Sequence, residues 1–390
     1  MVNTNMKLAK LNEISVGGKG TYGIAASAVD RCENLYTYLR ITDICDDGTL
    51  NRSGLKSVDD PDAAKYILKP NDIVFARTGG STGRNYFYDG SDGEFVYAGF
   101  LIKFSIDPEK ANPKYIKYYC QSSQYKNWVR SFNTGSTRGN INAQTFGNME
   151  IPLPERAQQD FLVDVLSPID EKIKINQQIN DNLQQQAMAL YASMFLDNLA
   201  LETTAGTLKD IADITMGQSP SGSSYNEDGN GEVFYQGRAE FGYRFPTRRL
   251  YTTEPKRMAE AGDVLLSVRA PVGDLNVAYE RCCIGRGLGA IHGRNGYQSF
   301  VLYTLFALRP QLDVYNGEGT VFGSINRNAL NDMPIDIPSE EAIAAFEAVV
   351  RPMDNMIRSN YEENCRLQEL RDSLLPRLMS GEVDVSDIQL

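Results

Sequence analysis

The chain has 390 residues, of which 42% are hydrophobic, and a formal net charge of −11. This length predicts two or three domains, each able to bury a core. No apolar run is long enough to span a membrane, and the first ten residues lack the apolar segment of a signal peptide, so we expect a cytoplasmic protein with no membrane contact.

The predicted elements, taken in chain order, alternate between mixed and purely helical stretches. Strand-like stretches lie at 36–41, 72–76 and 263–268, with glycine and proline between them, and residues 115–129 favour a helix. Ser167-Pro168-Ile169-Asp170 is typical of a helix start, with a serine cap, proline at the first position and an acid three residues after the cap. A long helix is therefore expected from Ser167 to about residue 196.

A heptad-like seam runs along this helix and returns near the C-terminus. Positions 169, 173, 176, 180, 183, 187, 190 and 194 alternate by four and three, as do positions 353 to 378. We expect the seam to include Ile169, Ile173, Asn176, Asn180 and Leu183 in the first copy and Ile357, Asn360, Asn364, Leu367 and Leu374 in the second. Asparagine in a seam lowers stability but fixes register. Arg371 takes the place of Ala187 and is expected at the rim or against an acid such as Glu171.

The second half of the chain repeats the first. Leu8 to Gly17 returns as Leu208 to Gly217, and Asp72-Ile73-Val74 returns as Asp263-Val264-Leu265. From Gly135 onward the offset is constant, so that Gly135 matches Gly319 and Asn176 matches Asn360. The repeat predicts large blocks at 1–150 and 203–338 and helical segments at 151–202 and 339–390.

These segments imply an α+β fold: two repeated mixed α/β domains separated by a pair of long antiparallel coiled-coil helices, with pseudo-two-fold symmetry. The alternative left open is that each helix packs only on its own block. The large blocks carry net charges of +2 and −2, and the helical segments −5 and −6. The global acidity therefore says little about what the large blocks bind.

No catalytic or metal-binding constellation is expected. The six cysteines include no C-x-x-C pair and His292 is the single histidine, so we predict reduced thiols, no metal and no cofactor. Asn112-Pro113-Lys114-Tyr115 lacks the second proline of an amino-methyltransferase loop and favours a helix start instead. Gly79-Gly80-Ser81-Thr82-Gly83-Arg84 follows a strand and could cradle a phosphate, although a plain turn fits equally well.

Several stretches resemble the specificity subunits of type I restriction-modification systems. They are Ile151 to Pro154, Phe161 to Asp170, Asn176 to Leu183, Arg269 to Gly273, Gly285 to Gly289 and Leu374 to Gly381. The resemblance covers nearly the whole chain and implies two target recognition domains and two helical spacers. It also implies a non-catalytic subunit that reads a split double-stranded DNA target, one half per domain, with two methyltransferase subunits and the restriction (motor and nuclease) subunits as partners.

Candidate DNA contacts follow from this resemblance. The stretch 236–251 holds four arginines among four aromatic residues, and self-repulsion makes such a cluster unfavourable unless an anion, here phosphate, meets it. Arginine can also read guanine, and glutamine adenine. The expected contacts are Arg77, Thr78, Ser81, Thr82, Arg84, Ser136, Thr137, Arg138 and Asn140 in the first block and Gln236, Arg238, Arg244, Arg248, Arg249, Arg269 and Arg286 in the second.

Two other functions compete with this interpretation. A fused methyltransferase-specificity protein would need a cofactor-binding domain for which the chain has no room. A coiled-coil scaffold that binds no DNA would have the same two helices. A gel shift that shows no DNA binding in the presence of methyltransferase subunits would support this function.

Overall fold

The computed structural model of the chain describes residues 7–380 and 382, apart from 133–138 and 318–322. It divides into two compact units, of which unit 1 is Met1–Lys174 with Asn364–Leu390 and unit 2 is Ile175–Glu363. Each unit contains one large block and part of each of the two long helices, α4 (Arg156–Tyr191) and α9 (Glu340–Met379). The unit boundaries thus cut across the four segments expected from the repeat.

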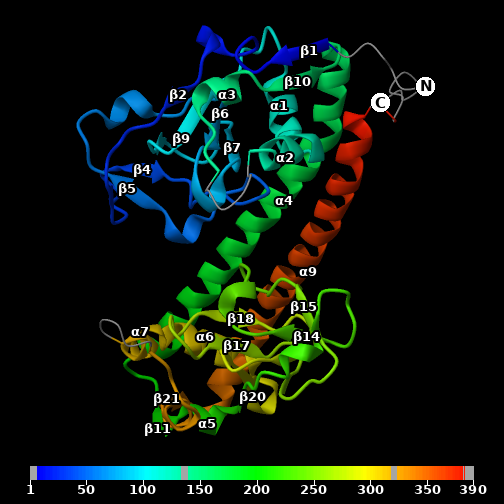
Figure 1. Ribbon diagram of the computed structural model, residues 1–390. Helices are drawn as coiled ribbons and strands as arrows, with labels where there is room; N and C mark the ends of the chain where they lie inside the picture. Colours follow the sequence, from blue (N-terminus) through cyan, green and yellow to red (C-terminus); the bar gives the residue numbers. More distant parts are fainter. Residues whose placement is uncertain (1–6, 133–138, 318–322, 381, 383–390) are drawn as a thin grey trace. The chain divides into compact units, whose positions relative to one another are not determined.

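The described residues of unit 1 form two four-stranded sheets, a two-stranded pair and three short α-helices, besides their parts of α4 and α9. One sheet has the order β2–β9–β6–β7 (Thr21–Tyr22, Leu101–Ser105, Asp72–Ala76 and Asn85–Tyr88). The other is β3–β5–β4–β8 (Ala28–Val29, Lys56–Val58, Tyr36–Leu39 and Phe95–Tyr97). The pair is β1–β10 (Lys7–Lys10 and Glu150–Leu153), and the helices are α1 (Pro113–Tyr119), α2 (Ser123–Arg130) and α3 (Ala143–Gly147). Figure 1 shows α1 and α2 beside α4 within this unit.

Unit 2 is built on the same plan. Its four-stranded sheet is β12–β20–β17–β18 (Ala212–Met216, Leu288–Gly293, Val264–Ser267 and Leu275–Val277). The second sheet is β13–β15–β14–β19–β16 (Tyr225–Asn226, Leu250–Thr252, Glu232–Tyr235, Cys282–Ile284 and Met258–Ala259). The unit also contains the pair β11–β21 (Thr203–Thr207 and Pro334–Pro338) and the α-helices α5 (Leu208–Ile211), α6 (Gln298–Ala307), α7 (Arg309–Asp313) and α8 (Arg327–Asn331).

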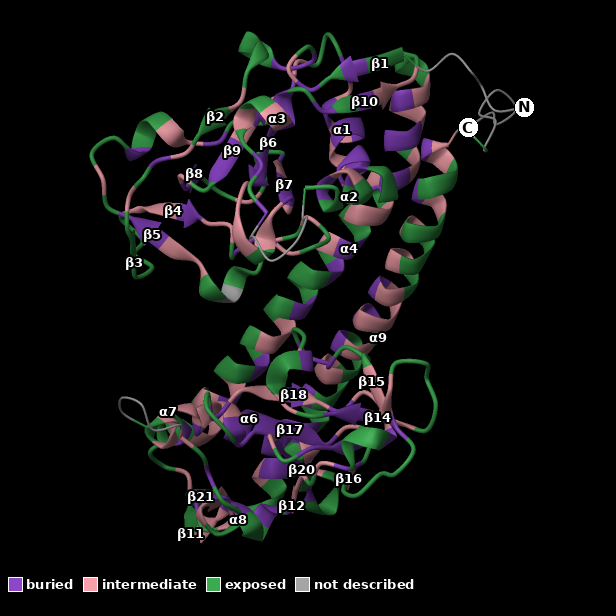
Figure 2. Cartoon of the chain, viewed as in Figure 1, coloured by how far each residue is buried: buried purple, intermediate pink, exposed green. Residues whose placement is uncertain are grey.

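Strands β6 and β17, which are inner strands of the sheets β2–β9–β6–β7 and β12–β20–β17–β18, are buried along their whole length. In β6, Ile73 and Phe75 belong to the core shared with the helices, whereas Val74 and Ala76 belong to the core shared with the second sheet. This alternation follows from the two-residue period of a strand. Figure 2 shows β6, β9 and β17 as mostly buried. A strand buried on both faces is held rigidly, so the residues that follow it have a well-defined position.

Both long helices contribute to both cores, and they run antiparallel. In unit 1, Leu162 and Leu166 of α4 lie in one cluster with Leu375 and Met379 of α9. In unit 2, Tyr191 of α4 lies in one cluster with Phe346 of α9. N-terminal residues of each helix pack with C-terminal residues of the other, as predicted for an antiparallel pair. The alternative, in which each helix packs only on its own block, is wrong.

Every predicted seam position is buried or half-buried. In unit 2, Asn360 donates from Nδ2 to Oδ1 of Asn180 at 2.8 Å, and Asn176 donates to Glu363 at 2.7 Å. The polar layers are therefore hydrogen-bonded within the helix pair. Buried polar groups must find partners, so these bonds favour one register over its neighbours. The remaining seam positions named in the sequence are Ile169, Ile173, Leu183, Ile357, Asn364, Leu367 and Leu374, and none of them is exposed.

Some predicted boundaries were wrong. Helix α4 begins at Arg156, and Pro168 lies inside it rather than at its first position. The helix continues because Leu162, Val163 and Leu166, which precede the proline, are buried in the core of unit 1. The helix expected over 115–129 is two helices, since Ser122 caps α2 by accepting from Tyr125 N at 3.3 Å. Asn112 caps α1, as the sequence indicated.

The alignment of the repeat at the start of each block also needs correction. Leu11 N donates to Met149 O and Leu208 N donates to Met333 O, at 3.1 and 3.0 Å. Leu208 therefore corresponds to Leu11, three residues later than the sequence match with Leu8 suggested. The constant offset that pairs Met149 with Met333 agrees with the sequence.

A repeated aspartate anchors each block to a helix. Asp170 of α4 accepts hydrogen bonds from Lys117 Nζ at 2.5 Å, Tyr118 Oη at 2.9 Å and Arg371 Nη1 at 3.3 Å. Asp354 of α9, its counterpart in the repeat, accepts from Tyr303 Oη at 3.0 Å and pairs with Arg244. Arg371 thus meets an acid, as expected, although the acid is Asp170 and not Glu171. Burial alone would raise the pKa of Asp170, but Lys117, Arg371 and Tyr118 hold that pKa below its ordinary value.

We predict that Asp170→Asn destabilises unit 1 by roughly 1.5–3 kcal/mol at neutral pH, the usual range for hydrogen bonds to a charged group. Because the pKa of Asp170 is lower in the folded state than in the unfolded state, its charge stabilises the folded state at pH values above the unfolded-state pKa of about 4. This stabilisation is lost as the pH falls through the folded-state pKa. Denaturant unfolding at pH 7 and near pH 3 measures this. The exposed Asp164→Asn on the same helix is the control. A difference between Asp170→Asn and the wild type that is independent of pH would contradict the prediction.

Candidate nucleic-acid interface

In unit 1, the loops at one end of the sheet β2–β9–β6–β7 bring several predicted contacts together. Arg77 and Thr78 directly follow β6, and Thr78 forms a bridge with Asn140. Thr82 donates from Oγ1 to Gly79 O at 2.7 Å and to Gly139 O at 3.0 Å. We call the loops 22–24, 77–83, 98–100 and 139–141 the strand-end loops of unit 1. They hold five of the predicted contacts: Arg77, Thr78, Ser81, Thr82 and Asn140.

Four other predicted contacts of the first block do not join this group. Arg84 pairs with Asp46 at 2.6 Å and donates to Ile44 O at 3.1 Å, so its charge is already neutralised within the chain. Ser136, Thr137 and Arg138 lie outside the described residues. They stay predictions.

Two aromatic residues that the sequence analysis did not single out flank Arg77. Its guanidinium carbon lies 5.3 Å from the ring centroid of Tyr22 and 5.9 Å from that of Phe100. Arg77 Nε is buried, and the described residues provide it with no hydrogen-bond partner. The two rings lie far from Arg77 in the sequence and are brought to it by the order β2–β9–β6 of the sheet, which no local pattern reveals.

Unit 2 repeats the backbone geometry of these loops. Gly23 N donates to Leu101 O and Gly217 N donates to Leu288 O, at 3.2 and 2.9 Å. A Cβ atom at either glycine would lie 2.2 Å from a backbone oxygen, that of Tyr97 or that of Gly285. Only glycine allows so close an approach of the two segments. The equivalent loops 216–218, 268–273, 285–287 and 323–325 are the strand-end loops of unit 2.

The strand-end loops of unit 2 bring together the predicted contacts Arg269 and Arg286, with Gln236 beside them. Val268 N and Gly287 O are 3.0 Å apart, and Gln236 O accepts from Gly287 N at 3.2 Å. Arg269 forms an isolated β-bridge with Ser324, just as Thr78 does with Asn140. Arg269 therefore corresponds to Thr78, and Val268, which precedes Arg269, corresponds to Arg77. Arg269 and Arg286 are exposed, and neither has a carboxylate partner among the described residues.

The arginine cluster between Gln236 and Tyr251 is neutralised by the chain itself. Arg238 pairs with Asp274, Arg248 with Glu280 at 2.5 Å, and Arg249 with Glu240 at 2.6 Å. The carboxylates relieve the self-repulsion of the cluster, so phosphate is not needed to explain it. The side chains of Arg248 and Arg249 are still 51% and 53% exposed and can reach a ligand.

Arg244 has a structural position instead of a place on the surface. Its side chain is only 5% exposed, pairs with Asp354 and donates to Gln184 Oε1 at 3.2 Å. It also lies over the ring of Tyr303, 5.8 Å from its centroid. Arg244 therefore ties the second block to both long helices. These groups occupy the guanidinium in this structure, so we do not include Arg244 in the candidate interface, and its DNA contact stays a prediction.

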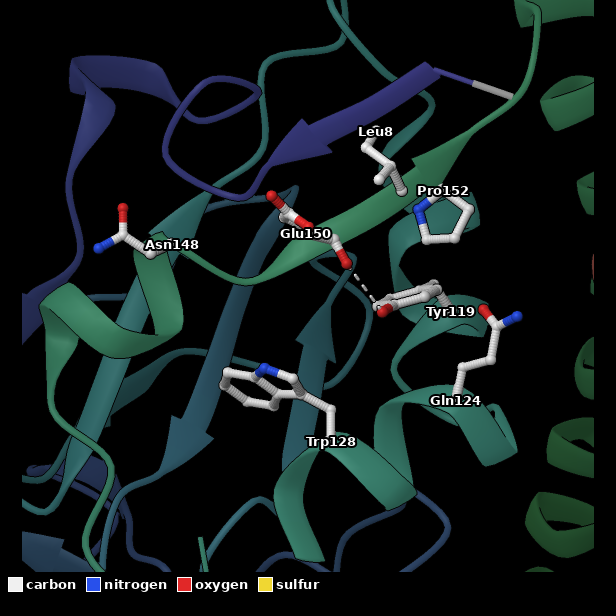
Figure 3. A pocket seen from close by; sticks show the side chains of 7 residues that line it. All are labelled: Leu8, Tyr119, Gln124, Trp128, Asn148, Glu150 and Pro152. Carbon is white, nitrogen blue, oxygen red and sulfur yellow. Dashed lines mark hydrogen bonds between the residues drawn. The ribbon is translucent and has the colours of Figure 1, made fainter. Parts of the chain in front are cut away.

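A hollow of about 420 Å³ on unit 1 lies apart from the predicted contacts. Figure 3 shows Trp128 and Tyr119 at this hollow, where Tyr119 Oη donates to Glu150 O at 3.2 Å. The other lining residues are Leu8, Gln124, Asn148 and Pro152. The titratable side chains in the lining are Glu150 and Tyr119, and none of the predicted contacts belongs to it.

The described residues include no group of three or more histidine, cysteine, aspartate and glutamate side chains that could hold a metal ion. Among the same residues, no helix is long and apolar enough to cross a membrane. All six cysteines are free thiols.

Comparisons with known proteins agree on one family. A family model for the type I restriction modification DNA specificity domain matches residues 28–185. A protein of Methanocaldococcus jannaschii, assigned as the MjaX specificity subunit of a type I restriction enzyme, is 30% identical over 355 residues, which cover 85% of this chain and 83% of that protein. The HindI specificity subunit of Haemophilus influenzae is 22% identical over 412 residues, covering 83% of this chain and 89% of that protein.

A solved structure has a similar fold. The crystal structure of the type I restriction-modification S subunit from M. genitalium matches over 97% of each chain with a TM-score of 0.51 and 17% sequence identity.

Proposed function

The chain belongs to the DNA specificity subunits of type I restriction enzymes, and on this premise we propose that it reads a two-part target in double-stranded DNA, one part through each unit. As a specificity subunit it is not catalytic. We further propose that it holds two methyltransferase subunits and the restriction subunits of the enzyme, and that it acts in the cytoplasm. The observation that carries the proposal is the repeated backbone geometry of the strand-end loops.

The two sets of strand-end loops share a backbone but differ in their side chains. Arg77 of unit 1 corresponds to Val268 of unit 2, and Thr78 corresponds to Arg269. One scaffold with different side chains in its two copies is what reading two different half-targets requires, because base edges are distinguished by side-chain donors and acceptors.

The charge distribution supports the same loops as the main DNA contacts. Arg77, Arg269 and Arg286 have no carboxylate partner among the described residues, whereas Arg238, Arg248 and Arg249 each have one. An arginine that is already paired gains less from a phosphate, because the new contact must compete with the existing ion pair. We therefore assign Arg238, Arg248 and Arg249 a secondary role.

The long helices offer a surface for the partner subunits. In unit 2, Ile175, Ile179, Val349 and Met356 of α4 and α9 are exposed although they are large and apolar. Exposed apolar residues of this kind are typical of protein–protein contacts. We propose that they contact the methyltransferase subunits. A scaffold that binds partners through this surface but does not bind DNA is the competing function.

We predict that the double variant Arg269→Ala, Arg286→Ala has a weaker salt dependence of DNA binding. The slope of log K against log salt concentration should decrease in magnitude by about one to two. Arg248→Ala with Arg249→Ala should change that slope by less than about half a unit, because both arginines already have carboxylate partners. The measurement is a DNA-binding titration of the complex with methyltransferase subunits at several salt concentrations. Equal changes for the two double variants would contradict the assignment, and failure of the wild-type complex to bind DNA would support the scaffold.

Exchanging one block should change one half of the target. Residues 7–153 replaced by the corresponding block of a relative with a different target should alter one half-site in a methylation map and leave the other intact. Exchange of residues 203–338 is the matched control and should alter the opposite half. The exchanged block must keep the contacts to α4 and α9 that complete its core. If either exchange alters both halves, the units do not read independently.

A further inference from the structure

Arg77 is held in a way that no other arginine of the described residues shares. It lies over two aromatic rings, those of Tyr22 and Phe100, while Arg244, Arg248 and Arg358 each lie over one. Those three arginines also pair with carboxylates, whereas no described carboxylate pairs with Arg77. We call Arg77, Tyr22 and Phe100 the arginine clamp.

The backbone fixes the clamp on both sides. Arg77 N donates to Phe100 O at 3.1 Å, and Ile141 N donates to Arg77 O at 2.9 Å. Tyr22 Oη accepts from Ala143 N at 3.1 Å, which holds its ring. An arginine normally loses much side-chain entropy on binding, and the rings reduce that loss by ordering the guanidinium beforehand.

The clamp is accessible to a ligand. Tyr22 is 42% exposed and Phe100 is 56% exposed, so two large rings border the guanidinium at the surface. Arg77 Nε is buried, which leaves the terminal Nη1 and Nη2 groups as the donors that can meet a ligand. Two parallel N–H donors fit a pair of acceptors in one plane, and the O6 and N7 atoms of guanine in the major groove are such a pair.

We propose that the arginine clamp reads a guanine in the half-target of unit 1, with Arg77 Nη1 and Nη2 donating to O6 and N7 and the two rings holding the guanidinium plane. The inference rests on the proposed function of the chain, and it specifies one base and the side chains that select it. A phosphate contact would need the charge of Arg77 but not its planar fork.

The clamp belongs to unit 1 alone. Its positions correspond to Val268, Met216 and Gly287 in unit 2, as the hydrogen bonds of Gly217 and Val268 and the pairing of Met216 with Gly289 show. Because none of these three residues is an arginine or an aromatic, an effect of the clamp should be confined to one half-site.

The test is a methylation map of cells that carry the complete system with variants of this chain. We expect Arg77→Ala and Arg77→Lys each to relax one position of one half-site, where the wild type requires guanine, by about 5- to 150-fold in preference. Phe100→Leu should relax the same position to a smaller extent. Arg52→Lys, at an exposed arginine of the same unit that pairs with Asp92, is the control and should leave the map unchanged.

Three results would overturn the inference. A wild-type motif with Arg77→Ala would show that Arg77 reads no base. Relaxation at an A·T position, or in both half-sites, would contradict guanine reading by this unit. Loss of methylation at all sites with both Arg77→Lys and Phe100→Leu would show a structural role. A wild-type map without a two-part motif would instead contradict the proposed function itself.

Discussion

The antiparallel pairing of α4 and α9 is the constraint on which the rest of the structure depends. Each large block lacks a complete core of its own, because side chains from both helices fill it: Leu166 and Leu375 in unit 1, Tyr191 and Phe346 in unit 2. Fully burying such a side chain contributes roughly 1.5–3 kcal/mol. The seam asparagines and the aspartates Asp170 and Asp354 then select one register and attach each block to the helices through a charged contact.

The rigid attachment matters for function because base reading requires well-placed side chains. The inner strands β6 and β17 are buried along their whole length, so the strand-end loops begin from fixed positions. Gly23 and Gly217 keep the same close backbone approach in the two units, while the side chains around them differ. The backbone scaffold is thus the same in the two units, while the side chains proposed to contact DNA differ between them.

The helices and the seam could be predicted because they depend on local periodicity. The repeat could be predicted because matching residues recur at a constant offset along the chain. The sequence-based prediction misplaced the start of α4, because Pro168 is a typical first residue of a helix and only the buried contacts before it show that the helix has already begun. It named Arg77, Thr78 and Asn140 as candidates, and the structure brings these three residues together. It could not find Tyr22 and Phe100, which join Arg77 through the order of the sheet. It also assigned the cluster around Arg248 to phosphate, because Asp274 and Glu280, the carboxylates that pair with Arg238 and Arg248, lie outside the stretch 236–251.

The central claim is that one chain reads two half-targets through two copies of the same scaffold. The most direct measurement is a map of methylated bases in the genome of cells that carry the wild-type chain with its methyltransferase subunits, compared with cells that lack this chain. The account predicts one motif in which two short specified sequences are separated by a fixed number of unspecified bases. A continuous motif, a motif with one specified part, or methylation that does not depend on the chain would contradict it.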